Sequence, residues 1–287
     1  MRIIVLGANG LLGNTIIRYF FENCKYETFG FCRDSTKLGF LNANYLERIN
    51  IVNDIFDTED LKNKIKKIRP DVIINSIGIT NKIKNKDSNF TQQIIQVNSL
   101  FPHQLQNICI QLDIRLIHLS SDCVFSGEKG FYSELDSADP VDIYGKSKLL
   151  GELDFQNSIT IRKSVIGHEY NSNNGLLEWF LKQEGEVKGY KKAIFSGITV
   201  LELAKIIDMY IIPNPNLRGL FHVSGQSISK YNLLKIIASE YKKIIDIIPN
   251  EEVKIDRSLN STKFNKITGY QSKPWPKLIK SMAKFNL

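Results

Sequence analysis

The chain has 287 residues and a formal net charge of +8, with 43% hydrophobic and 24% charged residues. This is the composition of a soluble globular protein, and no apolar stretch approaches the ~20 residues of a membrane span. The lysines are spread along the chain without interleaved aromatic residues, so we expect neither a nucleic-acid partner nor a membrane contact. The cysteines have no metal-site or disulfide spacing, which indicates a reducing cytoplasm and no metal; they are Cys24, Cys32, Cys109 and Cys123.

The first predicted element is a buried parallel strand, Ile3–Leu6, followed directly by a glycine-rich turn. Apolar residues after the turn are spaced as one face of a helix. In this order, backbone N–H groups and a helix N-terminus can contact a pyrophosphate, although an ordinary tight turn is the alternative. We expect the turn to bind a dinucleotide through Gly7, Asn9, Gly10, Leu11, Leu12 and Gly13.

The second predicted strand, Glu27–Cys32, is followed by Arg33 and Asp34. An acidic residue at this point usually binds the adenosine ribose of NAD, whereas an arginine favours the 2′-phosphate of NADP. Arg33 therefore predicts NADP(H), and Asp34 keeps NAD(H) as the alternative cofactor. A solvated charge at the end of the strand is the simpler explanation of Arg33.

Strands and helices alternate through the first two thirds of the chain, which predicts an α/β fold with a doubly wound parallel sheet. The pattern becomes irregular after Ile166. We expect a Rossmann domain over residues 1–166, completed by about 193–225, and a smaller C-terminal α/β substrate-binding domain over 167–192 and 226–287. Further strands are expected at Arg48–Ile51, Val72–Ile77, Arg115–Ser120, Thr160–Ile166 and Leu220–Val223, and helices at Leu61–Ile68, about 90–112 and Leu201–Ile212.

Three polar residues in the middle of the chain carry candidate chemistry. Tyr144 and Lys148 are four residues apart on a predicted helix, so both side chains share one face. A lysine ammonium favours the phenolate, which predicts a lowered tyrosine pKa and proton exchange near neutral pH. Ser121 follows a strand of the parallel sheet, at the edge where ligands bind. A solvated helix face and a plain strand-end hydroxyl are the alternatives.

Together these motifs resemble the extended short-chain dehydrogenase/reductase superfamily, over nearly the whole chain. Residues 118–127 (HLSSDCVFSG) and 144–152 (YGKSKLLGE) are similar to the corresponding segments of dTDP-4-dehydrorhamnose reductases and their UDP-sugar relatives. Residues 161–181 look most like reductases of UDP-2-acetamido-2,6-dideoxyhexosuloses. The resemblance implies NADP(H)-dependent reduction of the C4 keto group of a nucleotide-linked 4-keto-6-deoxyhexose, in deoxysugar and polysaccharide biosynthesis.

The resemblance also implies roles for individual residues. Tyr144 would donate the proton, Ser121 would hydrogen-bond the same oxygen, and Lys148 would hold the nicotinamide ribose. Further cofactor contacts would come from Asp54, Ile55, Asn75, Ser76, Ile77 and Gly78. Substrate contacts would come from Asp122, Val124, Phe125, Ser164, Ser196 and Arg257.

Two departures from related enzymes bear on the substrate. Sugar-nucleotide dehydratases of the superfamily have Asp-Glu after the catalytic Ser or Thr, whereas this chain has Asp122 and Cys123, which argues against a dehydratase. Rhamnose-forming reductases have a tryptophan where Val165 stands, so we expect a UDP-linked rather than a dTDP-linked sugar. The alternatives are a dTDP-4-dehydrorhamnose reductase, an epimerase with tightly held NAD, and a non-catalytic regulatory subunit like the beta subunit of methionine adenosyltransferase. A homodimer is compatible with all of them.

Cys123 and His168 raise the hypothesis that C3 or C5 is epimerised as well. GDP-fucose synthase, a relative that epimerises and then reduces, has its active-site cysteine where Cys123 stands, and a histidine near the position of His168. A thiol and an imidazole on opposite faces of a sugar ring have suitable chemistry. The alternative is a buried apolar filler at Cys123 and a surface residue at His168.

Overall fold

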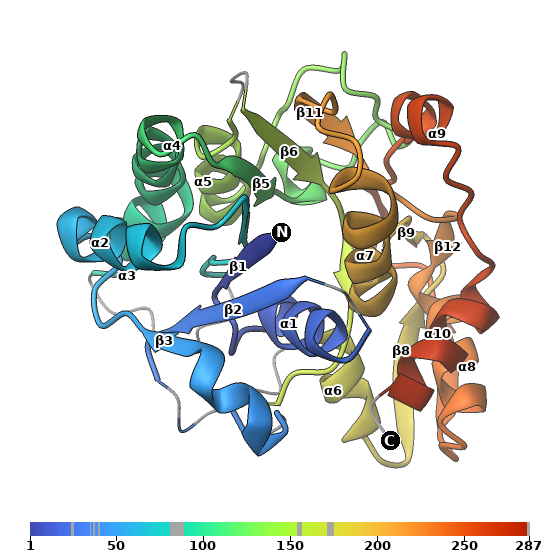
Figure 1. The fold of residues 1–287 in the computed structure, drawn as a ribbon. Coiled ribbons are helices and arrows are strands. Elements are labelled where there is room, and N and C mark those ends of the chain that lie inside the picture. Colours follow the sequence, from blue (N-terminus) through green and yellow to red (C-terminus); the bar gives the residue numbers. More distant parts are fainter. Residues whose placement is uncertain are drawn as a thin grey trace.

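The computed structural model describes residues 1–23, 26–34, 36, 38–39, 41–80, 89–153, 157–170 and 175–285. Cys24 therefore lies outside the described residues. In the described part of the chain, a central sheet lies between two layers of helices, and a group of shorter strands and helices lies at one side (Figure 1).

Within the described residues, the central sheet has seven strands, all paired in parallel, in the order β11-β6-β5-β4-β1-β2-β3. The order reverses at β1, and in doubly wound sheets the ligand crevice lies at this switch point. The predicted α/β class and doubly wound parallel sheet are confirmed. The strands are β1 (Arg2–Leu6), β2 (Glu27–Cys32), β3 (Ile49–Ile51), β4 (Val72–Asn75), β5 (Arg115–Leu119), β6 (Ser158–Arg162) and β11 (Gly219–His222).

β1 is apolar throughout its interior because helices cover both faces of the sheet. Ile3 and Val5 belong to one core cluster, and the alternating residues Ile4 and Leu6 belong to another. The first cluster includes residues of α1 (Leu11–Asn23) and α7 (Val200–Ile206), which is continued by the π-helical turn η5 (Ile207–Ile211). Helices α2 (Thr58–Ile68), α3 (Phe90–Ile95), α4 (Phe101–Gln111) and α5 (Ile143–Leu150) lie on the other side.

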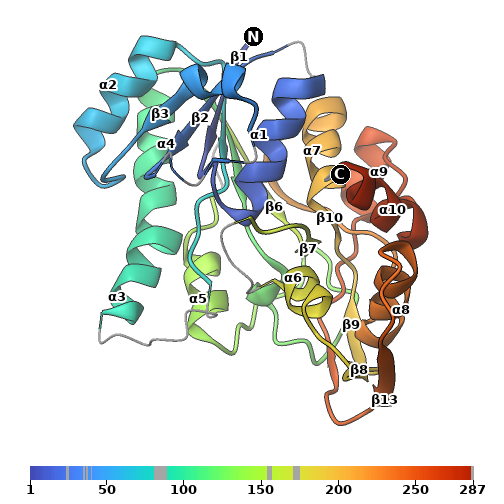
Figure 2. The same ribbon diagram turned by 90° about the horizontal axis from the view of Figure 1, so that it is seen from below.

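A smaller group of elements lies beside the sheet, mostly from the last third of the chain (Figure 2). It contains three small sheets, β7–β10, β12–β9–β14 and β8–β13, and a separate core cluster. The predicted domain boundaries stay a prediction. The elements are β7 (Val165–Ile166), α6 (Leu176–Leu181), β8 (Glu186–Tyr190), β9 (Ala193–Phe195), β10 (Ile198–Thr199), β12 (Ile228–Ser229), α8 (Lys230–Glu240), β13 (Asp246–Asn250), β14 (Ile255–Asp256), α9 (Thr262–Thr268) and α10 (Trp275–Phe285).

Three expected elements are interrupted, including the helix expected at Leu201–Ile212, which is divided into α7 and the π-helical turn η5. The strand expected at Thr160–Ile166 is divided between β6 and β7, because the chain changes partners: the Lys163 carbonyl accepts from the N–H of Asp122, and the Ser164 carbonyl accepts from that of Ile198. The long helix expected at about 90–112 contains a π-helical turn, η3 (Gln96–Leu100). Such turns often occur at functional sites.

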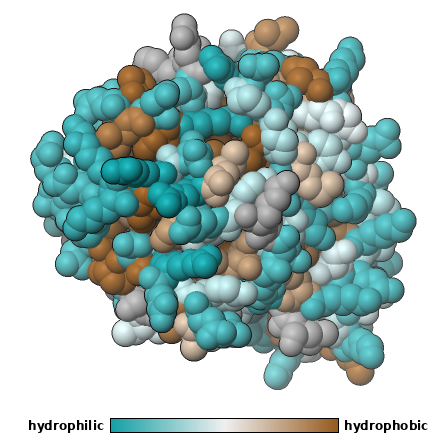
Figure 3. Space-filling view, viewed as in Figure 1, coloured by the Kyte–Doolittle hydropathy of each residue, from teal (hydrophilic) through white to brown (hydrophobic). Residues whose placement is uncertain are grey.

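Hydrophilic side chains cover most of the face shown in Figure 3, and apolar side chains form patches among them. Within the described ranges, no helix combines the length and the apolar character needed to cross a bilayer. The same part of the chain contains no cluster of three or more His, Cys, Asp or Glu residues suited to a metal ion.

Candidate active site

The glycine turn between β1 and α1 is built so that the backbone comes very close to itself. A Cβ atom at Gly13 would lie 2.0 Å from the carbonyl oxygen of Gly7, so only glycine lets α1 pack this tightly on the turn. The Gly10 N–H donates to the Gly7 carbonyl at 2.9 Å. Leu11 and Leu12 begin α1, and the first N–H groups of a helix have no acceptor inside it. The turn therefore fits a pyrophosphate.

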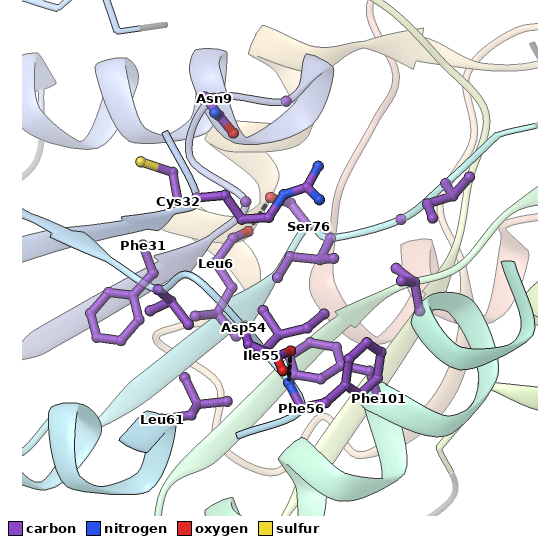
Figure 4. Close-up of a pocket in the computed structure, with 18 of the residues that line it drawn as sticks. Leu6, Asn9, Phe31, Cys32, Asp54, Ile55, Phe56, Leu61, Ser76 and Phe101 are labelled. Carbon is purple, nitrogen blue, oxygen red and sulfur yellow. Dashed lines mark hydrogen bonds between the residues drawn. The ribbon is translucent and has the colours of Figure 1, made fainter. Parts of the chain in front are cut away.

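A cavity of about 310 Å³ extends from this turn along the carboxyl ends of β2, β3 and β4. Figure 4 shows Asn9 at one end and the rings of Phe56 and Phe101 at the other. Asp54 accepts a hydrogen bond from the N–H of Phe56 at 2.8 Å, which shapes the loop after β3. The apolar end suits an aromatic base. Expected cofactor residues that line the cavity are Gly7, Asn9, Gly10, Arg33, Asp54, Ile55, Ser76, Ile77 and Gly78.

Arg33 and Asp34 differ in what their side chains can reach. Arg33 is exposed and lines the cavity. The carboxylate of Asp34 accepts from the backbone N–H of Thr36 at 2.9 Å and from its hydroxyl at 2.5 Å. The Asp34 backbone carbonyl accepts from the Asn9 side chain. The Asp34 carboxylate thus stabilises its own loop, whereas Arg33 lines the cavity at the strand end where a 2′-phosphate is expected.

The end of β4 is held by buried polar contacts. Asn75 is fully buried, and its amide contacts His118 Nδ1 on the neighbouring strand at 3.2 Å. The Asn75 side-chain oxygen also accepts from the N–H of Ile77 at 3.1 Å. Ser76 donates its hydroxyl proton to the Leu6 carbonyl. These bonds fix the backbone that lines the cavity, so Asn75 acts behind the cofactor surface rather than on it.

Asn98, in the π-helical turn, is a site residue that the sequence analysis missed. Its side chain bonds both the N–H and the C=O of Ile79, each at 2.8 Å, and donates to the hydroxyl of Ser147 in α5 at 3.0 Å. Asn98 therefore joins the cavity wall to the helix that carries Tyr144. The sequence signal for this role is weak: a polar residue at a buried position of an apolar helix.

Ser121 and Tyr144 meet at the end of β5. Ser121 caps the short 3₁₀ turn η4 (Asp122–Val124), and Asp142 caps α5 by accepting from the N–H of Gly145 at 2.7 Å. The Ser121 and Tyr144 side chains are hydrogen-bonded. Lys148, one turn further along α5, is 3% exposed and donates to the Leu119 carbonyl at 2.9 Å. The three expected catalytic residues are therefore brought together.

The electrostatics of the pair differ from the expectation. Burial of Tyr144, together with the nearby Cys123, raises the pKa of the phenol above its usual value, and the hydrogen bond with Ser121 only opposes this. Burial, with the charge of Lys163, lowers the pKa of Lys148 to about 7. The prediction that Lys148 lowers the tyrosine pKa is wrong for this structure, because burial disfavours both charged forms.

A buried ion pair stabilises the position of α5, the helix that carries Tyr144 and Lys148. Glu152, just after α5, accepts from Arg162 of β6 at 2.8 and 2.7 Å and from the Ser120 hydroxyl at 2.6 Å. Bidentate contacts of this kind fix geometry well. The pair connects the end of α5 to two strands, which holds Lys148 in place.

Cys123, two residues after Ser121, is in contact with Arg257. The Arg257 guanidinium donates to the Cys123 sulfur at 3.5 Å, and Arg257 Nε is buried without a partner among the described residues. Burial and the carboxylate of Asp122 raise the pKa of the thiol to about 12. Cys123 is thus a neutral thiol, and the unsatisfied Arg257 donor suits an anionic or oxygen-rich substrate group.

His168 lies in the loop after β7, as expected, but its ring is engaged on both sides. Nδ1 contacts the Glu178 carboxylate at 2.6 Å and Nε2 contacts the Tyr241 hydroxyl at 2.7 Å. Among the described residues, its ring has no contact with Cys123 or Ser121. Its place in catalysis stays a prediction.

Other expected substrate residues have structural contacts. Val124 and Phe125 are fully buried in a core cluster, and Phe125 stacks on Tyr132. Their side chains therefore do not reach a surface where substrate could bind. The Ser196 hydroxyl accepts from the Leu259 N–H at 2.8 Å. Ser164 is half-buried, and its carbonyl holds β10.

A family model described as the RmlD substrate binding domain matches residues 1–285. The dTDP-4-dehydrorhamnose reductase of Aggregatibacter actinomycetemcomitans is 24% identical over 315 residues, covering 99% of both chains. The methionine adenosyltransferase 2 subunit beta of Mus musculus is 28% identical over 260 residues, covering 84% of this chain and 72% of that one.

Among solved structures, a dTDP-4-dehydrorhamnose reductase from Bacillus anthracis in complex with NADP has a TM-score of 0.79 at 21% identity and covers 99% of both chains. This likeness concerns the fold. The family model, by contrast, matches nearly the entire sequence. The protein therefore belongs to the RmlD substrate binding domain family, in the nucleotide-sugar reductase branch that its motifs predicted.

Proposed function

We propose that this protein is an NADP(H)-dependent reductase of the C4 keto group of a nucleotide-linked 4-keto-6-deoxyhexose. The observation that carries the proposal is the meeting of Ser121 and Tyr144, hydrogen-bonded to each other, with the buried ammonium of Lys148 one helical turn away. Asn98 connects their helix to Ile79 in the wall of the dinucleotide cavity. The helix that carries Tyr144 is thus joined to the wall of the cofactor cavity through Asn98.

Each residue has a distinct task in this reaction. Bound NADPH would supply the hydride to C4. Tyr144 would give its proton to the carbonyl oxygen; its raised pKa keeps the phenol protonated until charge develops on that oxygen. Ser121 would donate a second hydrogen bond to the same oxygen. Lys148, whose pKa is lowered to about 7, would hold the hydroxyl groups of the nicotinamide ribose.

NADP(H) is the cofactor that the site supports. Arg33 lines the cavity, while the Asp34 carboxylate is engaged by Thr36. The relative from Bacillus anthracis holds NADP. NAD(H) stays the alternative.

We propose dTDP-4-dehydrorhamnose as the substrate, in place of the UDP-linked sugar expected from the sequence. The full-length relative from Aggregatibacter actinomycetemcomitans is named a dTDP-4-dehydrorhamnose reductase. Val165, which prompted the UDP expectation, is half-buried in β7 and pairs with β10. The small side chain at this position therefore reflects local packing as well as the shape of the substrate. The UDP-linked substrate is tested beside the dTDP-linked one.

The geometry favours reduction without epimerisation. The raised pKa of Cys123 leaves it without the thiolate that a general base needs. His168 is held by Glu178 and Tyr241 on both ring nitrogens. Epimerisation by this pair would require His168 to leave both partners.

The deciding experiment incubates the protein with NADPH and a panel of dTDP-, UDP- and GDP-linked 4-keto-6-deoxy sugars, and follows NADPH absorbance and product. We expect turnover with the dTDP-linked sugar. Turnover with only the UDP-linked sugar would move the proposal to that substrate. A second candidate, a cofactor-binding regulatory subunit, is favoured by the mouse relative; it predicts NADP(H) binding without turnover of any sugar.

A further inference from the structure

Lys163, directly after β6, is an unusual residue for the interior of this site. It is only 7% exposed, and among the described residues none hydrogen-bonds or ion-pairs with its ammonium, although the Asp122 carboxylate lies near enough to favour the charged form. Placing a lysine side chain in so buried a position without a close ion pair costs free energy of folding. The location of Lys163 therefore calls for a role in what the site binds.

Lys163 lies at the catalytic centre. Its backbone carbonyl accepts from the N–H of Asp122 at 3.1 Å, so it flanks the residues that follow Ser121. Its ammonium is attracted by the Asp122 carboxylate and repelled by the Lys148 ammonium. Two ammonium groups, from α5 and from the end of β6, thus lie beside the point where Ser121 meets Tyr144.

We propose that Lys163 makes the site select the reduced cofactor, by placing a second positive charge beside the nicotinamide ring. This inference rests on the proposed function, because hydride transfer to a carbonyl held by Ser121 and Tyr144 requires the ring to lie next to them. When the hydride leaves with its electron pair, the neutral ring becomes cationic. Nearby ammonium groups oppose that cation and do not oppose the neutral ring.

The size of the effect follows from Coulomb's law. Unit charges about 8 Å apart at an effective dielectric constant of about 20 repel strongly enough to change a dissociation constant by about tenfold or more. Burial lowers the pKa of Lys163 only to about 8, so the group is mostly charged at pH 7. NADPH is therefore held more tightly than NADP⁺, which favours occupancy of the site by the reduced cofactor and release of the oxidised one.

The test measures dissociation constants of NADPH, by fluorescence, and NADP⁺, by calorimetry, at pH 7 and without substrate. In Lys163→Met we expect the ratio of the NADP⁺ to the NADPH constant to fall by about tenfold, mainly because NADP⁺ binds more tightly. Lys163→Arg should keep the ratio. Lys146→Met removes an exposed charge on the same helix as Lys148 and should also keep it.

Removing a buried, unpaired charge should not impair folding, and Lys163→Gln serves as a second neutral variant if Lys163→Met is poorly folded. An unchanged ratio in the folded neutral variants overturns the inference, as does an equal weakening of both cofactors, which indicates a structural role. A protein that binds NADPH and NADP⁺ but reduces no sugar overturns the proposed reaction while the binding ratio still tests Lys163.

Discussion

Gly145 of α5 lies directly against the backbone of Cys123: a Cβ atom at position 145 would be 2.1 Å from the Cys123 carbonyl oxygen. Tyr144 precedes this contact and Ser121 lies two residues before Cys123. Because Gly145 has no side chain, α5 and the η4 turn approach closely enough for the hydroxyl groups of Tyr144 and Ser121 to form a hydrogen bond.

Gly145→Ala should separate these groups. We expect kcat to fall by about 10²-fold, since a misplacement of about 1 Å can cost this much, while the dissociation constant of NADPH changes little. Gly39→Ala is the matched control, because a Cβ there meets nothing within 4 Å. Normal kcat in Gly145→Ala would show that the close approach does not set the catalytic geometry.

Tyr144→Phe removes the proton donor and keeps the ring. Turnover should drop by about 10²–10⁴-fold with NADPH binding largely intact, because a positioned general acid contributes this much. Tyr210→Phe, in the π-helical turn after α7, should leave turnover unchanged. Activity of Tyr144→Phe near that of the unmodified protein would remove Tyr144 from the proposed mechanism.

Arg33→Ala should weaken NADPH binding by about tenfold or more, because hydrogen bonds between charged groups contribute about 1.5–3 kcal/mol. NADH lacks the 2′-phosphate and should bind as before, so the preference for NADPH shrinks. Arg48→Ala, another exposed arginine nearby in sequence, is the control. Equal binding of the two reduced cofactors by the unmodified protein would contradict the role of Arg33.

The sequence was most informative where function depends on local order. The apolar run of β1, the glycines after it and Ser121 at the end of β5 each follow from short-range patterns. That Ser121 would meet Tyr144 was implied by the family resemblance, and the strand-end position of Ser121 agrees with the rule that ligand sites of parallel sheets gather at the carboxyl ends of the strands.

Features that depend on distant partners could not be predicted in the same way. β6 ends where Lys163 and Ser164 bond to different segments, and Asn98 acts on Ile79, 19 residues away in the sequence. The local pattern gives at most a weak signal for either relation, because it does not identify the distant partner. The tyrosine pKa was predicted from helical spacing alone, and burial, which depends on the whole fold, reversed its direction.

The unliganded protein should become more stable as the pH rises from 7 to 8.5. The folded pKa values of Lys148 and Lys163, about 7 and about 8, lie below the ordinary 10.5. In this range the unfolded chain binds more protons than the folded one, so the free energy of unfolding increases with pH, by at most about 1.4 kcal/mol per unit for each lysine. Denaturant titrations should show a shallower rise in Lys148→Met. A fall in stability over this range would contradict the lowered pKa values.

Reaction in deuterated water distinguishes simple reduction from reduction with epimerisation. Inverting C3 or C5 removes a ring proton and returns one from solvent, so epimerisation leaves deuterium on that carbon. We expect none, because burial and Asp122 keep Cys123 as a thiol and His168 is held by Glu178 and Tyr241. Mass spectrometry and NMR of the product measure the label. Deuterium at C3 or C5 that disappears in Cys123→Ser or His168→Asn, while reduction continues, would establish the pair as the epimerising acid and base and would require His168 to exchange its partners during turnover.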